Sequence, residues 1–151
     1  MVRKELVFAK ADLTSRDAVI RLIAEAADKE GLLADREEFI RAVYRREEEI
    51  STSIGHGIAI PHGKTDAVKE AFMAFASAEK PFLWDENSTD EINGVFLIGV
   101  PQSKADTLHL RAIAAVSKKL INDEFRNKLF ACQNSTEAYN MLNEIDQGIK
   151  E

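Results

Sequence analysis

The stretch AFMAFASAEKPFLWDENSTDEINGVFLIGV, residues 71–100, decides the fold of this chain of 151 residues. It begins with one apolar run, residues 71–78, and ends with another, residues 94–100. Short apolar runs bounded by turn residues are typical of strands buried inside a sheet. The sequence WDENSTDEING predicts a polar connection between the two strands. Pro101 predicts the end of the second strand, because proline cannot donate a hydrogen bond to a sheet.

An amphipathic helix is predicted before this stretch. Thr14 or Ser15 can cap its N-terminus, the pattern runs to about Lys29, and Gly31 indicates where the helix ends. The apolar side chains recur at the spacing of one helix face, so we expect that face to be buried. The residues expected on it are Val19, Ile20, Leu22, Ile23 and Ala26.

A second helix is predicted over DREEFIRAVYRREEEI, residues 35–50. Asp35 is followed three residues later by Glu38, a pattern that resembles a capping box. The side chains that we expect to point inward are Phe39, Val43 and Tyr44. The polar, glycine-containing sequence STSIGHG that follows predicts a loop.

The remaining segments continue the alternation of strands and helices. Short strands are predicted at residues 5–9 and 57–60, the latter ended by Pro61. A helix through about Ile121, starting at Ser103 or Asp106, is expected to bury Leu110, Ile113, Ala114, Ser117 and Leu120. Two further helices are predicted near residues 123–131 and 135–147. Strands interleaved with helices predict an α/β sandwich in a single domain.

Composition excludes several classes of protein. A formal net charge of −6 argues against a protein that binds nucleic acid, which needs a basic face. Cys132 is the only cysteine, which excludes an intramolecular disulfide, favours a reducing compartment and predicts a small buried side chain. The sequence MVRKELVFAK does not resemble a signal peptide, and no apolar run is long enough to span a bilayer. We therefore expect a cytosolic protein that does not insert into a membrane.

The sequence GHGIAIPHGKT, residues 55–65, ends like a nucleotide-binding loop but does not fit one. Such a loop has four residues between its first glycine and Gly-Lys-Thr, whereas five residues separate Gly57 from Gly63. Those five residues, Ile-Ala-Ile-Pro-His, favour a strand whose N–H groups are not free to surround a triphosphate. No bound nucleotide or other cofactor is expected.

His62 is the strongest candidate for chemistry in this segment. It comes directly after a predicted strand, between Pro61 and Gly63, and ligands of open α/β sheets bind just past strand ends. A neutral imidazole has a free lone pair on one ring nitrogen and is a competent nucleophile toward phosphorus. Positive charge near a phosphoryl group could come from His109, one turn inside a helix, and from Arg46. From spacing alone, a solvated charge run is the favoured interpretation of Arg46, and His109 could equally be a core boundary residue.

A metal site is the competing interpretation of these histidines. His56 and His62 are six residues apart and would lie about 20 Å apart in an extended chain. That separation is too large for one metal ion, so no metal is expected. We expect His56 at the edge of the pocket. Lys64 and the hydroxyls of Ser51, Thr52 and Ser53 are most simply ordinary loop groups, close enough in sequence to line the pocket.

Two segments resemble the A component (EIIA) of the bacterial phosphoenolpyruvate-dependent sugar phosphotransferase system, in its fructose/mannitol class. The first is RREEEISTSIGHGIAIPHGKTDAV, residues 45–68, and the second is GVFLIGVPQSKADTLHLRAIAAVSKKL, residues 94–120. The resemblance implies one EIIA domain over residues 1–151, with a mixed β-sheet flanked by helices. It also implies that His62 is phosphorylated, that His109 helps to position the phosphoryl group, and that Arg46 does the same.

The resemblance further implies a phosphotransferase with a phosphohistidine intermediate. The phosphoryl group would come from the carrier protein HPr and pass to a cysteine on the EIIB component of a membrane permease complex, for sugar uptake. Ile54 and Ile58 are expected to border the surface on which these partners dock. The alternative is a regulatory relative of the nitrogen type, which signals through its phosphorylation state.

Overall fold

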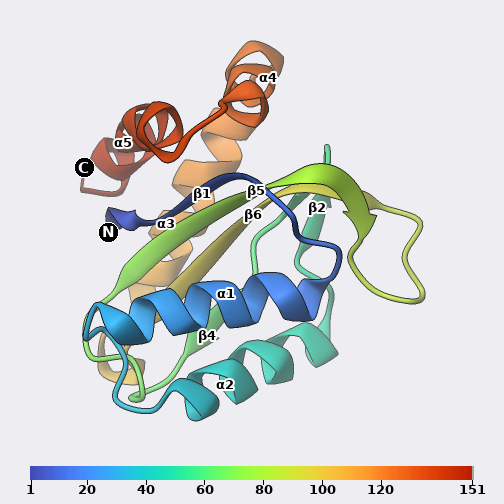
Figure 1. Cartoon of the computed structure of the whole chain (residues 1–151). Helices are drawn as coiled ribbons and strands as arrows, with labels where there is room; N and C mark the ends of the chain where they lie inside the picture. Colours follow the sequence, from blue (N-terminus) through green and yellow to red (C-terminus); the bar gives the residue numbers. More distant parts are fainter. Residues whose placement is uncertain (151) are drawn as a thin grey trace.

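A mixed β-sheet lies between two layers of helices in the computed structural model of the chain, as Figure 1 shows. The structure describes residues 1–150, apart from the side chains of residues 104–106 and 150. In chain order the elements are β1 (Val2–Ala11), α1 (Arg16–Lys29), α2 (Arg36–Glu49), β2 (Ser53–Gly55), β3 (Ile58–Ala59), β4 (His62–Lys64), β5 (Phe72–Leu83), β6 (Glu91–Val100), a 3-10 turn (Gln102–Lys104), α3 (Ala105–Leu120), α4 (Asp123–Ala131) and α5 (Ser135–Lys150).

The strand β6 is the centre of the sheet. It pairs antiparallel with β5 and parallel with both β3 and β4, and the overall order is β1-β5-β6-β3-β2. One edge is β1, parallel to β5, and the other is β2, antiparallel to β3. The antiparallel pair β5–β6 contains the two apolar runs that predicted buried strands.

Alternate residues of these two strands form separate cores on the two faces of the sheet. Phe72 and Leu97 belong to the core beneath α1 and α2, whereas Met73 and Phe96 belong to the core beneath α3, α4 and α5. Because each strand is apolar on both sides, both faces need a layer of helices to exclude water. The predicted α/β sandwich with a mixed sheet is therefore confirmed.

The predicted N-termini of the first two helices are also confirmed. The Ser15 hydroxyl and the Asp35 carboxylate each accept a hydrogen bond, 3.1 Å long, from the backbone N–H three residues later. The Glu38 carboxylate accepts hydrogen bonds from the side chains of Arg41 and Arg45, which compete with the backbone contact of a capping box. Past the end of α1, Gly31 has φ +74°, a left-handed conformation that glycine tolerates.

The prediction of the strands was incomplete. The strand β1 extends beyond residues 5–9 at both ends, β5 continues past residue 78 to Leu83, and β6 begins at Glu91, inside the predicted polar connection. The predicted loop STSIGHG contains β2, which forms a tight hairpin with β3. Strands this short show no periodicity of their own, because their stability comes from the strand beside them.

The predicted buried face of α3 is partly wrong. Of the five expected residues, Leu120 is buried and Ile113 and Ser117 are half-buried, but Leu110 is 57% exposed and Ala114 is also exposed. Ala112 and Val116, which were not expected on this face, are buried. Alanines and larger apolar residues occur all around this helix, so the sequence pattern did not define one face. The side chain of Asp106, one of the two expected first residues, lies outside the described residues. In the first two helices the error is smaller, since only Leu22, Ala26 and Tyr44 of the expected residues are half-buried instead of buried.

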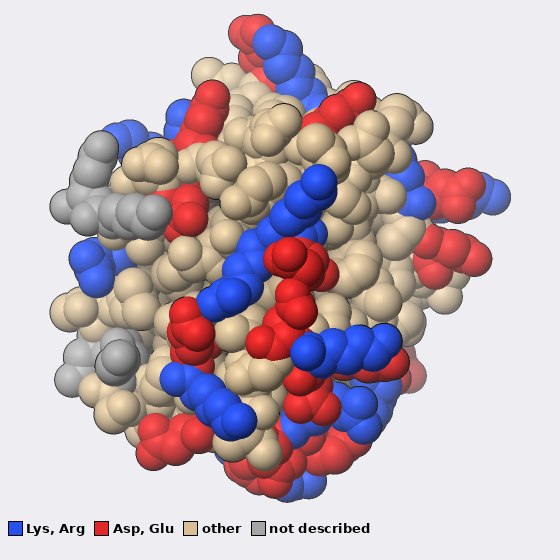
Figure 2. Space-filling model, turned by 60° about the vertical axis from the view of Figure 1, so that its left-hand side comes forward, with Lys and Arg blue, Asp and Glu red and all other residues tan. Residues whose placement is uncertain are grey.

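The surface carries mixed charge. Figure 2 shows Lys and Arg side chains interspersed with Asp and Glu side chains over the face that it draws. Cys132, at the end of α4, is buried as predicted. Among residues 1–150, no helix combines the length and the apolar character needed to cross a bilayer.

Candidate functional site

His62 is the first residue of β4, which pairs with β6 next to Ile98. We expected this histidine just past a strand and open to solvent, but it lies inside the sheet and is only 8% exposed. The correction follows from a partner far away in the sequence, because β6 supplies the hydrogen bonds that continue the strand past Pro61. The ring of His62 nevertheless lines a surface pocket, so the site combines a fixed backbone with an accessible side chain.

One hydrogen bond fixes the tautomer of His62. Its Nδ1 lies 3.2 Å from the backbone carbonyl oxygen of Ile60. Because a carbonyl oxygen only accepts, Nδ1 carries the hydrogen in this contact, and the lone pair of the neutral ring is on Nε2. Nε2 is therefore the nucleophilic atom of this imidazole.

The surroundings of His62 favour the neutral form of its ring. Burial lowers the pKa of His62 below its usual value of 6.5, and the positive charges of Arg46 and His109 lower it further. The hydrogen bond to Ile60 and the Glu47 carboxylate act in the opposite direction without reversing the shift. Lowering the pKa below 6.5 increases the fraction of rings that have a lone pair at pH 7.

His109 reaches the same pocket from α3, which lies on the opposite face of the sheet from α2. It lies in the first turns of α3, and its ring centroid is 5.9 Å from that of His62, with an angle of 38° between the ring planes. Both rings line one pocket. The two histidines that the sequence selected are thus neighbours in space.

Arg46 lines this pocket as well, from the last turn of α2. Its Nη1 donates a hydrogen bond, 2.8 Å long, to the backbone carbonyl oxygen of Ile50. Arg46 is half-buried, whereas the neighbouring Arg45 is exposed and pairs with Glu38 at 3.2 Å. Both arginines of the charge run RREEE line the pocket, and they differ in that Arg45 is exposed and paired with Glu38, which spacing alone did not reveal.

The pocket has a volume of about 330 Å³, and α2, β4 and α3 line it. In addition to the three predicted residues, it contains Lys64, Arg45, Glu49 and Ala42. Lys64 lies two residues after His62, so the two side chains are on the same face of β4. We treated Lys64 as an ordinary loop group because the sequence did not reveal β4. The alternation of side chains along a strand was the signal that would have placed it.

Three other predictions for this region fare differently. His56 is exposed at the turn between β2 and β3, with φ +58°, and is not among the residues that line the pocket. Ile58 is fully buried, so it cannot border a docking surface, while Ile54 is 45% exposed. Ser51, Thr52 and Ser53 do not line the pocket, and Thr52 is buried.

Gly63 has a packing role in the site. A Cβ added there would lie 2.8 Å from Cε1 of Phe39 and 3.0 Å from Cγ2 of Val43. We expected this glycine to let another backbone approach. Instead, the missing side chain lets α2 pack closely on β4, and this contact brings Arg46 toward His62.

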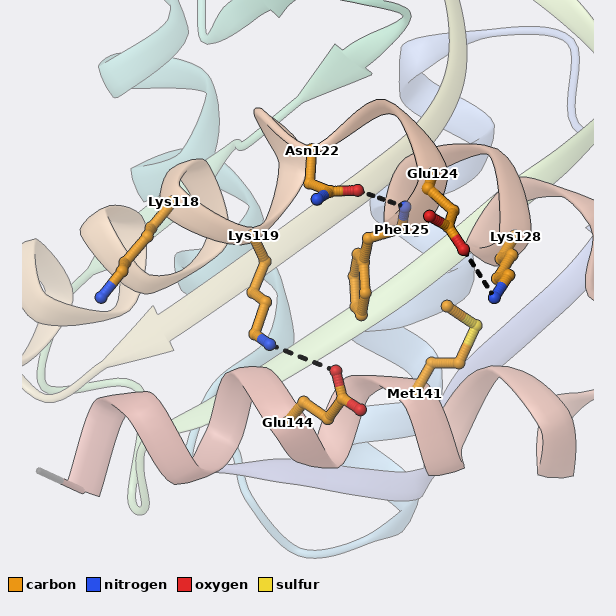
Figure 3. A pocket seen from close by; sticks show the side chains of 8 residues that line it. All are labelled: Lys118, Lys119, Asn122, Glu124, Phe125, Lys128, Met141 and Glu144. Carbon is orange, nitrogen blue, oxygen red and sulfur yellow. Dashed lines mark hydrogen bonds and ion pairs between the residues drawn. The ribbon is translucent and has the colours of Figure 1, made fainter.

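A second pocket, of about 630 Å³, lies between α3, α4 and α5 and is drawn in Figure 3. Two of its three lysines are paired with its carboxylates: Lys119 pairs with Glu144 at 3.2 Å and Lys128 with Glu124 at 3.1 Å. Asn122 caps α4 by accepting from the N–H of Phe125. This pocket holds no imidazole, thiol or hydroxyl, so nucleophilic chemistry points to the His62 pocket. No group of three or more His, Cys, Asp and Glu side chains in the described part of the chain could hold a metal ion.

Comparison with known proteins identifies the family of the chain. A family model described as "Phosphoenolpyruvate-dependent sugar phosphotransferase system, EIIA 2" matches residues 1–145. The chain is 31% identical to the "PTS system 2-O-alpha-mannosyl-D-glycerate-specific EIIABC component" of Escherichia coli, over 97% of this chain but only 22% of that protein's length. It is 31% identical to the E. coli "PTS system fructose-like EIIA component" over 74% of this chain and 75% of the relative. It is 29% identical to the E. coli "Nitrogen regulatory protein" over 97% and 89%.

Solved structures share the fold. The nitrogen regulatory protein IIA-Ntr from Neisseria meningitidis matches with a TM-score of 0.82 at 23% identity, over 93% of this chain and 95% of that one. The IIAMTL chain in its complex with phosphorylated enzyme IIBMTL from E. coli matches with a TM-score of 0.78 at 20% identity, over 97% and 99%. The family model covers nearly the whole length, and this chain therefore belongs to the EIIA 2 family of the phosphoenolpyruvate-dependent sugar phosphotransferase system.

Proposed function

We propose that this protein is a phosphoryl carrier that accepts a phosphoryl group on His62 from HPr and passes it to a cysteine on an EIIB component. The observation that carries the proposal is the pocket in which His62, His109 and Arg46 meet. Membership of the EIIA 2 family supports a phosphoryl-transfer role, and the pocket supplies a nucleophile and positive charge to perform it.

The transfer needs one bond to form and one to break. The Nε2 lone pair of His62 attacks phosphorus, and the P–N bond of the donor phosphohistidine breaks, with its electron pair returning to the donor ring. The Nδ1 hydrogen of His62 stays on the ring and keeps its hydrogen bond to the Ile60 carbonyl oxygen, which stabilises the positive charge that the ring acquires. The reverse sequence, with a cysteine thiolate as the attacking group, delivers the phosphoryl group to EIIB.

Charge around the pocket favours the bound phosphoryl group without trapping it. Arg46 and Lys64 supply positive charge, His109 offers an imidazole, and Glu49 opposes them with one carboxylate. The oxygens of a phosphoryl group in transfer carry most of its negative charge, so positioned cations stabilise it. An open pocket, in which water screens these charges, suits a carrier that must also release the group.

The partners would dock over the apolar side chains near the pocket. Ile50 is 67% exposed beside the Arg46 contact, and Leu110 is exposed next to His109 in the chain. Together with Ile54, these residues offer exposed apolar surface to a partner. The fold is shared with the IIAMTL chain solved in complex with phosphorylated IIBMTL, which supports an EIIB component as one partner. The setting would be the cytoplasmic side of a membrane permease complex.

A regulatory role is the second candidate. The E. coli nitrogen regulatory protein matches 97% of this chain and 89% of its own length, whereas the mannosylglycerate-specific relative is a far longer protein. In this alternative His62 is phosphorylated in the same way, but the phosphorylation state is read by a regulatory partner instead of feeding sugar uptake.

A labelling experiment tests the proposal. Phosphoenolpyruvate, enzyme I and HPr should place one acid-labile, base-stable phosphoryl group on His62, and His62→Ala should take up none. A full equivalent on His62→Ala would disprove the assignment. Adding candidate EIIB components to the labelled protein separates the two roles. Loss of label to an EIIB favours transport, and retention with every EIIB of the source cell favours regulation.

A further inference from the structure

The Glu47 carboxylate is buried beside the site, and no step of the proposed transfer uses it. Its side chain is 2% exposed. It accepts hydrogen bonds from the indole Nε1 of Trp84 at 3.0 Å, from the backbone N–H of Thr52 at 3.4 Å, and from the Thr52 hydroxyl. The Arg16 guanidinium lies 3.9 Å away. One carboxylate thus joins α2, the loop before β2, the end of β5 and the start of α1.

Such an arrangement is a poor way to gain stability alone. Burying a carboxylate loses its hydration, and paired buried charges often stabilise a fold no better than apolar side chains of the same size. The partners of Glu47 are directional, since a backbone N–H, a hydroxyl and an indole N–H each define a line. Glu47 is therefore suited to holding its partners in one geometry.

The hydrogen bonds of Glu47 affect the position of Arg46 through the segment that follows α2. Arg46 and Glu47 are consecutive residues of α2, and both form hydrogen bonds with the short segment that follows the helix. Arg46, which lines the pocket, donates to the carbonyl oxygen of Ile50, and Thr52 donates to Glu47 in the interior. Ile50 is the C-cap of α2, in an extended conformation with φ −163° and ψ 142°. A shift of Thr52 moves the Ile50 carbonyl, and the guanidinium that bonds to it moves too.

We propose that Glu47 is a positioning residue for phosphoryl transfer, which acts by fixing Thr52 and, through it, the Ile50 carbonyl that orients Arg46. The inference rests on the proposed function, since it assigns to Glu47 a role in that transfer. Glu47 touches no reacting atom. Its contribution is the alignment of a cation that does.

The test compares single-turnover phosphoryl transfer from phospho-HPr to the full chain and to three variants. Glu47→Gln removes the charge at constant size, and Thr52→Val removes one hydroxyl donor. Glu48→Gln, the adjacent exposed residue, is the matched control. We expect the first two to lower the maximal rate about tenfold, the scale of a small misplacement of a catalytic group. The HPr concentration for half-maximal rate should stay within about twofold, as should both quantities in Glu48→Gln.

Repeating Glu47→Gln and Thr52→Val in an Arg46→Ala background separates positioning from general damage. If Glu47 acts through Arg46, neither substitution lowers the rate further in that background. The same fold-loss with and without Arg46 would overturn the inference, as would rates within about twofold of wild type for both single variants. Should Glu47→Gln fail to fold, Thr52→Val decides alone, because it leaves the contacts of Trp84 and Arg16 in place. A wild-type chain that takes no label on His62 would instead refute the proposed function itself.

Discussion

The rings of His62 and His109, one on β4 and the other on α3, lie with their centroids 5.9 Å apart at the wall of one pocket. The elements β4 and α3 do not pair with each other as neighbouring strands do, and β6 lies between them in the chain. Both elements are therefore positioned by β6, because β4 pairs with it and α3 follows it after a short turn.

Replacing His109 with alanine should slow phosphoryl transfer to His62 without unfolding the protein. With its centroid 5.9 Å from that of His62, the imidazole is near enough to hydrogen-bond to a phosphoryl group on Nε2, and the loss of one donor to such a group slows related reactions by about a hundredfold. Single-turnover labelling from phospho-HPr gives the rate, and circular dichroism checks the fold. A rate equal to that of wild type would remove His109 from the site.

Arg46→Lys should not restore what Arg46→Ala loses. The guanidinium of Arg46 reaches the Ile50 carbonyl with one nitrogen while its others remain available to the pocket, and a lysine ammonium cannot make both contacts from a fixed plane. We expect both variants to be slowed by about tenfold or more in the same assay. Full activity of Arg46→Lys would show that the positive charge alone is sufficient, without the planar set of guanidinium N–H donors.

Lys64→Gln should shorten the lifetime of phosphorylated His62. Lys64 lies on the same face of β4 as His62 and lines the pocket, so it would offset the charge of the phosphoryl oxygens. Because Lys64 is exposed and water screens its charge, we expect an effect of only about threefold. Lys69→Gln, which removes an exposed charge outside the pocket, is the control. Equal lifetimes in the two variants would contradict a role for Lys64.

Stability should depend on pH through His62. The pKa of His62 is lowered from 6.5 by burial and by Arg46 and His109, so the unfolded chain binds a proton more readily than the folded one. The stabilisation is fully present above pH 6.5 and is lost as the pH falls through the lowered folded-state pKa. Denaturant unfolding at several pH values, in wild type and His62→Gln, measures this dependence. The variant should lose less stability in acid, and parallel curves would contradict the prediction.

Gly63→Ala should destabilise the fold. The new Cβ would lie 2.8 Å from Phe39 and 3.0 Å from Val43, two residues packed in the core, and overpacking of this kind costs about 1 to 3 kcal/mol. Gly148→Ala is the matched control, since its Cβ meets only Ala115 at 3.8 Å and alanine favours the helix. Thermal unfolding should show a lower midpoint for the first variant and an equal or higher one for the second. A Gly63→Ala protein as stable as wild type would mean that α2 can move away from β4.

Elements with local signals were predictable from the sequence. Ser15 and Asp35 cap their helices because a short polar side chain can satisfy the first free N–H groups, and this chemistry is visible within four residues. The long strands β5 and β6 were visible as apolar runs. The selection of His62, His109 and Arg46 depended on the family resemblance as much as on spacing, and the structure brings all three to one pocket.

Features that depend on distant partners were not predictable. The strand β4 exists because β6 is beside it, so neither the burial of His62 nor the direction of Lys64 could be deduced locally. The face that α3 buries was ambiguous, because alanine fits a core and a surface almost equally well. The network of Glu47 joins residues from three other segments, and nothing in RREEE distinguishes the one carboxylate that is buried.

The pairing of β4 with the central strand has a consequence for how the protein moves. The amide of Ile98 donates to the carbonyl of Pro61, and the amide of Thr65 donates to the carbonyl of Val100, one on each side of His62. These amides should exchange with deuterium as slowly as the most protected positions of the whole molecule, since they open only when the middle of the sheet does. The imidazole of His62 would then stay in place during phosphoryl transfer, while the donor and acceptor proteins bind and dissociate in turn.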